Sequence, residues 1–146
     1  MEGFVCLHCQ TFIPTNKFIG TAHRNHCPFC LWSKHVDEKF SGDRKSTCQE
    51  IMEPMGLTFK KEGLDKYGKE KVGEIMVIHR CTSCHKISIN RIAADDDPEK
   101  IMELFKNSQN LDQETKEKIK NSGVNLLTDK DKVEVKTQLF GKNNLN

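Results

Sequence analysis

Seven cysteines dominate the chemistry that this sequence can support, and six of them form three Cys-x2-Cys steps. The paired residues are Cys6, Cys9, Cys27, Cys30, Cys81 and Cys84, and the seventh is Cys48. A Cys-x2-Cys turn presents two thiolates to one ion at about 2.3 Å, so each step is half of a tetrahedral zinc site. Cysteines with only a packing role would have no reason to recur at a two-residue gap.

Two zinc ions, which we favour over one, would need eight ligands, so the seven thiolates leave one position for a histidine. His35, five residues after Cys30, is our first choice for this ligand. His26 and His79 are the alternates, and either could instead hydrogen-bond to a ligand.

The pairing of the steps is open between two arrangements. The gap of 17 residues between Cys9 and Cys27 suits a ribbon closed by the first two steps. The first and third steps are more alike, because apolar or β-branched residues flank both "FVCLHCQTFI" and "VIHRCTSCHKISI". We therefore favour the first and third steps around one ion, which would be bound by Cys6, Cys9, Cys81 and Cys84. The other ion would be bound by Cys27, Cys30, Cys48 and His35.

The sequence patterns around these ligands predict an α+β fold. We expect a small zinc-stapled domain of knuckles and short β-hairpins, similar to a zinc ribbon. "EIMVIHRC" and "HKISINRI" are expected to pair as a hairpin with the third step at its tip. Trp32, Val36 and Phe40 follow the second step at helical spacing, which predicts a short helix with Trp32 buried. The polar, glycine-containing residues 60–73 are expected to form an exposed loop.

We divide the chain into a zinc-binding domain over residues 1–97 and a short helical extension over residues 98–146. Asp97 followed by Pro98 is typical of a helix start, and the acids before it are expected to cap that helix rather than bind metal. The extension contains no cysteine or histidine, so any chemistry lies upstream.

The extension is expected to hold three further features. A second helix is bounded by Asp112 as its N-cap and by Gly123 as its stop. Residues 124–140 are expected to form a hairpin with its turn at "TDKDK". The last six residues should fray.

Composition limits the possible classes of protein. With 146 residues, 36% hydrophobic content and a mean hydropathy of -0.65, the chain can bury only a small core and needs metal staples. Its start has no signal-like apolar run, and no segment approaches the 18 apolar residues of a spanning helix, so no membrane association is expected. We expect a cytoplasmic protein, whose thiols stay reduced and bind metal.

Four polar residues are candidates for contacts with nucleic acid. They are Arg24, Asn25, Arg44 and Arg91. Arginine presents a rigid fork that suits phosphate, and Phe29 or Trp32 could stack on a base. Residues 1–92 carry 14 basic and 10 acidic side chains, an excess compatible with phosphate binding but too small to argue for it alone.

Several separated blocks resemble the RNHCP domain family of bacterial proteins, named after the run from Arg24 to Pro28. They are "RNHCPFCLWSKHVD", "GDR", Cys48, "MEPMG", "HRCTSC" and "NRIAADDD", in that order. The resemblance extends from about Phe4 to Asp97 and implies a small zinc-binding domain with no established reaction. One departure is His85, where family members usually have glycine after the final Cys-x2-Cys step.

We predict a non-enzymatic zinc-binding module whose partner is RNA or a ribonucleoprotein. A protein-protein interaction adaptor is the alternative. A metal-dependent nuclease of the His-Asn-His kind, with His23 or His26 as the base, is a further alternative, but the order of motifs differs from that family. A thioredoxin-like site would need one step in a βαβ setting, which three steps without such alternation do not provide. We assign no catalytic residue.

Overall fold

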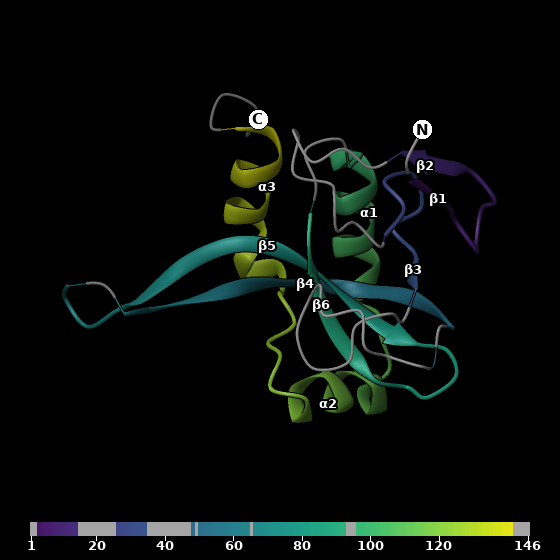
Figure 1. The fold of residues 1–146 in the computed structure, drawn as a ribbon. Helices are drawn as coiled ribbons and strands as arrows, with labels where there is room; N and C mark the ends of the chain where they lie inside the picture. Colours follow the sequence, from purple (N-terminus) through teal and green to yellow (C-terminus); the bar gives the residue numbers. More distant parts are fainter. Residues whose placement is uncertain are drawn as a thin grey trace.

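The computed structural model describes residues 3–14, 26–34, 48, 50–64, 66–92 and 96–141 of the chain. The fold is α+β, as predicted (Figure 1). The strands are β1 (Gly3–Val5), β2 (Phe12–Pro14), β3 (Ser33–Lys34), β4 (Ile51–Leu64), β5 (Glu70–Cys81) and β6 (Ile87–Arg91). The helices are α1 (Pro98–Ser108), α2 (Gln113–Asn121) and α3 (Lys132–Phe140), the last preceded by a 3-10 turn at Asp129–Asp131.

A long antiparallel hairpin of β4 and β5 is the centre of the fold (Figure 1). β3 pairs with the start of β4 and β6 pairs with the end of β5, so the sheet order is β3-β4-β5-β6. β1 and β2 form a separate two-stranded sheet. The predicted hairpin of β5 and β6 is confirmed, and its tip carries the third Cys-x2-Cys step.

The expected loop over residues 60–73 is wrong, because β4 and β5 continue through most of it. Lys61 pairs with Val72 and Leu64 pairs with Glu70, with irregular register between these pairs. A two-stranded ribbon with both faces in water carries polar residues just as a loop does. The composition of this segment therefore could not distinguish a ribbon from a loop.

The core lies on both faces of the sheet. α1 and α3 cover one face and α2 the other (Figure 1). The larger cluster consists of Leu31, Leu57, Ile75, Val77, Ile101, Met102, Phe105, Leu127 and Val135. A smaller cluster of Met55, Ile78 and Ile119 lies under α2. Both clusters combine residues from before and after position 97, and the division into a domain over 1–97 and an extension stays a prediction.

The start of α1 follows the prediction, whereas the end of the chain does not. The Asp97 carboxylate accepts a hydrogen bond from the Glu99 amide at 2.9 Å, as expected for an N-cap. The hairpin predicted over residues 124–140 is wrong, because that stretch contains the 3-10 turn and α3. Thr128 and Asp131 form a capping box, in which the Thr128 amide donates to the Asp131 carboxylate at 2.9 Å and starts the helical path.

α2 follows the prediction at both ends. Asp112 is its N-cap residue, and Gly123 follows the helix with a φ of 81°. This positive φ lies in the region that glycine adopts without strain. The fraying predicted for residues 141–146 stays a prediction, because only Gly141 of this stretch lies within the described ranges.

The helix predicted after the second step is wrong at its start, because Ser33 and Lys34 form β3 and pair with Met52 and Ile51. The rest of that helix, with Val36 and Phe40, lies outside the described residues. Trp32 is half-buried rather than part of the core. In the part of the chain that the structure describes, no helix combines the length and apolarity needed to cross a membrane.

Candidate metal centres

The three Cys-x2-Cys steps adopt the same backbone geometry. The residue after each second cysteine has a left-handed φ, 66° at Gln10, 67° at Leu31 and 63° at His85. The amides of these residues donate to the carbonyl of the first cysteine of the step at 2.9, 2.8 and 3.0 Å. The second step, which looked different in sequence, is therefore the same structural unit as the other two.

His85 occupies the left-handed position of the third step. A left-handed φ costs a residue with a side chain about 1 kcal/mol, and glycine avoids this cost. The structure keeps the turn in spite of the histidine, since the His85 amide still bonds to the Cys81 carbonyl.

The first candidate centre consists of the thiols of Cys6, Cys9, Cys27 and Cys30. The Sγ atoms of Cys6 and Cys30 are 3.6 Å apart and those of Cys9 and Cys27 are 3.7 Å apart. Four sulfurs at about 2.3 Å from a zinc ion in a tetrahedron would be about 3.8 Å apart, whereas a disulfide needs about 2.05 Å. The geometry therefore fits a metal site and excludes a disulfide between these atoms.

The electrostatics of the first centre also fit a cation. Burial raises the pKa of the Cys27 and Cys30 thiols, so neither would ionise readily without a positive charge nearby. A hydrogen bond with Thr11 lowers the pKa of the exposed Cys9 thiol to about 6. Amides of Cys9 and Phe29 donate to sulfur at 3.4 Å within their own steps, which favours the thiolates that zinc requires.

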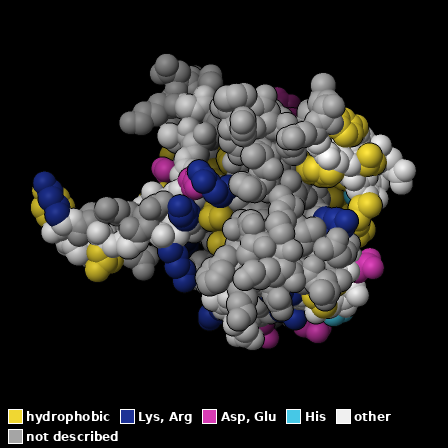
Figure 2. Space-filling model, viewed as in Figure 1, with side chains coloured by type: hydrophobic (Ala, Val, Ile, Leu, Met, Phe, Trp, Pro, Cys, Tyr) yellow, Lys and Arg dark blue, Asp and Glu magenta, His cyan; other side chains and the backbone are white. Residues whose placement is uncertain are grey.

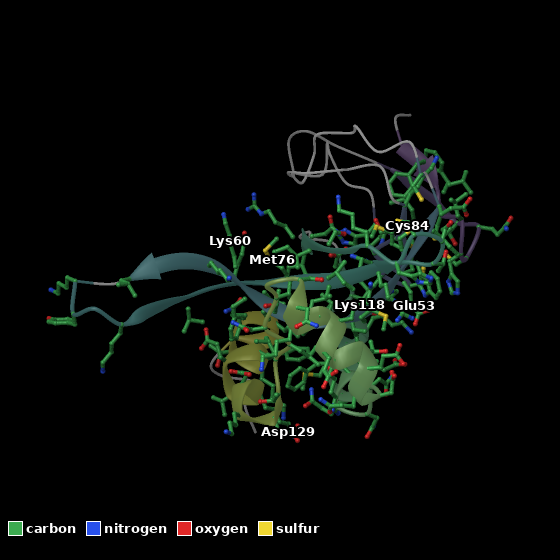
Figure 3. All side chains as sticks on the ribbon, turned by 90° about the horizontal axis from the view of Figure 1, so that it is seen from below. Glu53, Lys60, Met76, Cys84, Lys118 and Asp129 are labelled. Atoms are coloured by element: carbon green, nitrogen blue, oxygen red, sulfur yellow. The ribbon has the colours of Figure 1, made fainter. Side chains whose placement is uncertain are left out.

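The second candidate centre consists of the thiols of Cys48, Cys81 and Cys84, with Sγ atoms of Cys48 and Cys81 3.6 Å apart. Cys84 lies at the end of the sheet away from the β4–β5 turn (Figure 3). The backbone and side chain of Thr82 both donate to the Ile51 carbonyl, at 3.1 and 3.0 Å. The third step is thereby fixed to the start of β4.

The pairing favoured from sequence is wrong, and the alternative ribbon of the first two steps is correct. The register of β4 on β5 explains this result. Met52 pairs with Cys81, so the chain that leads into β4 brings Cys48 beside the third step. The first step then meets the second, whose flanking residues His26 and Ser33 form a bridge that continues into β3.

His35, the predicted eighth ligand, lies outside the described residues. The alternate His79 is fully buried, and its Nε2 donates to the Leu31 carbonyl at 2.6 Å, while the Asn90 amide donates to Nδ1 at 2.8 Å. Burial lowers the pKa of His79 to about 3, so the ring is neutral. Both ring nitrogens are used, and His79 holds the second step against β5 and β6 instead of binding metal.

The alternate His26 is also engaged in the protein interior. Its Nε2 donates to the Asp96 carboxylate at 2.7 Å, and both side chains are buried. One residue further along, the Asp97 amide donates to the Pro28 carbonyl at 3.3 Å. These contacts join the second step to the start of α1, a role that the sequence did not reveal because 70 residues separate the partners.

Of the residues predicted to bind nucleic acid, only Arg91 is described. Its side chain is exposed and forms an ion pair with Glu74 across β5 and β6, with 2.9 Å between Nε and Oε1. Arg24, Asn25 and Arg44 lie outside the described residues, as does His23. A patch that joins these residues stays a prediction.

Exposed apolar side chains surround the first centre, a feature that sequence reasoning missed. This knuckle face consists of Val5, Leu7, Phe12 and Phe29. Val5 and Phe12 are cross-strand partners and so point to the same side of the small sheet. Figure 2 shows hydrophobic side chains gathered at the end of the molecule where β1 and β2 lie. Beside it the rings of His8 and Trp32 stack, with centroids 4.1 Å apart and planes 1° apart.

A model of the RNHCP domain matches residues 1–102, a range that includes both thiol clusters and ends inside α1. The resemblance inferred from the sequence blocks is thereby confirmed. No curated protein and no solved structure matches the chain.

Proposed function

The chain belongs to the RNHCP domain family, and from this membership and its two thiol clusters we propose that it is a non-enzymatic zinc-binding module that binds RNA. The observation that carries the proposal is an aromatic surface at the first thiol cluster. Phe29, 61% exposed, lies between Cys27 and Cys30. Its backbone is held by the knuckle, so stacking a base on the ring would cost little ordering entropy.

The stacked rings of His8 and Trp32 add to this surface. His8 comes from the first step and Trp32 follows the second, so the two halves of the centre each supply a ring. Unpaired bases stack on aromatic side chains, and each such contact contributes about 1–3 kcal/mol. This arrangement favours single-stranded RNA, whose bases are accessible, over duplex RNA.

Zinc has a structural role in the proposal. The ligands would be all seven cysteines together with His35. They would give two ions four protein ligands each, which closes the coordination sphere and leaves no position for substrate. A cytoplasmic location belongs to the same proposal, because reducing conditions keep thiols available for metal.

Fluorescence anisotropy with labelled single-stranded and duplex RNA of equal length tests the proposal. We expect the zinc-loaded protein to bind the single strand more tightly, with an affinity that falls as salt rises. Phe29→Ala should weaken binding about tenfold, whereas Val133→Ala, which removes an exposed apolar side chain from α3, should not. Equal affinity of Phe29→Ala and the wild type would contradict the proposed surface.

A protein-protein adaptor is the second candidate, favoured by the aliphatic part of the knuckle face at Val5 and Leu7. Contiguous exposed apolar surface is typical of sites that contact other proteins. The salt series separates the candidates, because an adaptor would show no RNA binding at low salt or a salt slope near zero. The nuclease alternative gains no such support from His26, which is buried against Asp96 instead of facing water, and its other candidate base, His23, lies outside the described residues.

A further inference from the structure

Resting on the proposed function, we infer that the β4–β5 turn is a second RNA contact, remote from the knuckle face. The relevant segment, called the arm below, comprises residues 60–73, where the two strands extend away from the body of the protein (Figure 1). Its tip presents Lys66, Tyr67 and Lys69 around Gly68.

The base of the arm is anchored to α3. The Gln138 amide group accepts a hydrogen bond from the Ile75 amide at 2.9 Å and donates to the Gly73 carbonyl at 3.0 Å. Ile75 is fully buried, whereas Val72, three residues nearer the turn, is exposed. The transition from buried to exposed side chains at this point marks where the arm leaves the core.

The arm carries the side chains that recognise a nucleic-acid strand. Tyr67 is 76% exposed at the turn, and the Lys66 ammonium lies 5.0 Å from the centre of its ring. An exposed ring flanked by lysines can stack a base while the ammonium groups contact the phosphates on either side. Lys60 continues the basic side chains toward the body and lies near the base of the arm in Figure 3. The neighbouring Lys61 ammonium donates to the Gly123 carbonyl at 3.3 Å and so holds the arm to the body.

The chemistry of the tip favours RNA over an apolar protein partner. The described side chains of the turn itself, Lys66, Tyr67 and Lys69, combine two positive charges with one ring, and the aliphatic residue next to them is the exposed Leu64 at the end of β4. Gly68 allows the tight turn between Tyr67 and Lys69, because its φ of 79° is one that other residues rarely adopt. The attraction to phosphate is electrostatic and therefore sensitive to salt.

The distance between the two contacts sets the length of the ligand. The 14 residues of β4 span about 45 Å at about 3.3 Å per residue, and the knuckle face lies beyond the other end of this strand (Figure 1). At about 3.4 Å per nucleotide, a stacked strand of about 13 nucleotides reaches both contacts, and an unstacked, extended strand needs fewer.

The test measures anisotropy of a labelled 20-nucleotide single-stranded RNA of mixed sequence with the zinc-loaded full chain. We expect Tyr67→Ala to weaken binding about tenfold and Tyr67→Phe, which keeps the ring, to bind as the wild type. The double variant Lys66→Ala/Lys69→Ala should reduce the salt slope by about 1.4, the loss of two phosphate contacts on a single strand. Val72→Ala is the matched control on the arm and should have no effect.

A 5-nucleotide RNA separates the contacts further, because even fully extended it is too short to reach both. With this RNA, combining Phe29→Ala with Tyr67→Ala should weaken binding more than either substitution does alone. If the wild type binds the 20-nucleotide RNA and every arm variant binds equally well, the arm inference is overturned and the proposed function stands. If Val72→Ala weakens binding as much as Tyr67→Ala, the contact is an apolar one and the inference also fails. If the wild type bound no RNA at low salt, both the arm inference and the proposed function would be contradicted.

Discussion

The two ends of the β4–β5 hairpin differ in what stabilises them. At one end the third Cys-x2-Cys step and Cys48 form a thiol cluster. There His79 donates to the Leu31 carbonyl of the neighbouring knuckle and accepts from the Asn90 amide of β6. At the other end the strands have exposed side chains, and Gln138 is their last described hydrogen-bond partner from α3. An isolated two-stranded ribbon is marginally stable in water.

This difference shows that the interactions that stabilise this small chain are unevenly distributed along the hairpin. The hydrophobic clusters lie under the middle of the hairpin, where the helices pack. Beyond these clusters, order would come from metal ligation at one end, and at the other from strand bonds with the hydrogen bonds of Gln138 and Lys61. We therefore expect perturbations at the metal end to have large effects on the whole fold and perturbations at the arm to remain local.

The largest expected effect is loss of metal. Native mass spectrometry should detect two zinc ions, and chelation should unfold the knuckles, because a structural zinc contributes about 10–16 kcal/mol against a total stability of about 5–15 kcal/mol. Cys6→Ser/Cys27→Ser should lose one ion, since both residues belong to one cluster, whereas Cys6→Ser/Cys81→Ser should lose both. His35→Ala should weaken only the second site.

The pairing favoured from sequence makes the opposite prediction for the double variants, so the zinc count separates the two arrangements directly. A metal-free protein that kept the melting behaviour of the zinc-loaded form would refute the structural role of the metal. Val133→Ala, at an exposed position on α3 that belongs to neither cluster, is the control substitution for these variants.

An intermediate effect is expected for His79→Leu. At pH 7.5 this change should destabilise the fold by about 2–4 kcal/mol, because it leaves the Leu31 carbonyl and the Asn90 amide without their buried partner. The folded-state pKa of His79, about 3, lies below its unfolded value of about 6.5. The wild type therefore loses stability as pH falls from about 6.5 toward 3, by about 1.4 kcal/mol per pH unit.

The leucine variant lacks this proton linkage, so its deficit relative to the wild type should shrink on acidification. Urea unfolding of both proteins at pH 7.5 and pH 5.5 measures the change. Loss of zinc at low pH affects both proteins, so its effect cancels when the free energy of unfolding of one is subtracted from that of the other. A deficit that stayed constant with pH would show that His79 is not buried in its neutral form.

The smallest expected effect is at the arm. Gln138→Ala should cost about 1 kcal/mol for the hydrogen bonds lost to Ile75 and Gly73. Hydrogen exchange of the Ile75 amide should become faster, while amides in β6 such as Ile89 should keep their protection. Equal loss of protection along all of β5 would mean that the arm and the metal end unfold as one unit.

The sequence allowed the local units to be predicted better than their assembly. The knuckles, the β5–β6 hairpin and the Asp97 cap depend on residues close together in the chain, and these features are confirmed. The grouping of the steps depends on the register between Met52 and Cys81, which no local pattern encodes. The same holds for the contact between His26 and Asp96.

α3 illustrates a second reason for failure. "VEVK" alternates apolar and charged residues as a strand does, and Val135 is the only residue of α3 that is fully buried. With so narrow an apolar face, the helical period was not visible in the sequence. The capping pair Thr128 and Asp131 was the available signal, and "TDKDK" was interpreted as a turn instead.

The Gln138 carboxamide has a consequence for how this protein behaves among copies of itself. β6 ends opposite Met76, and beyond that point the side chain of Gln138 bonds to the β5 backbone as a further strand would. Exposed strand edges invite edge-to-edge association and fibre growth, and lysines on such edges oppose it. Gln138, with Lys60 and Lys61 on β4, thus lets the sheet project far into solvent while discouraging aggregation.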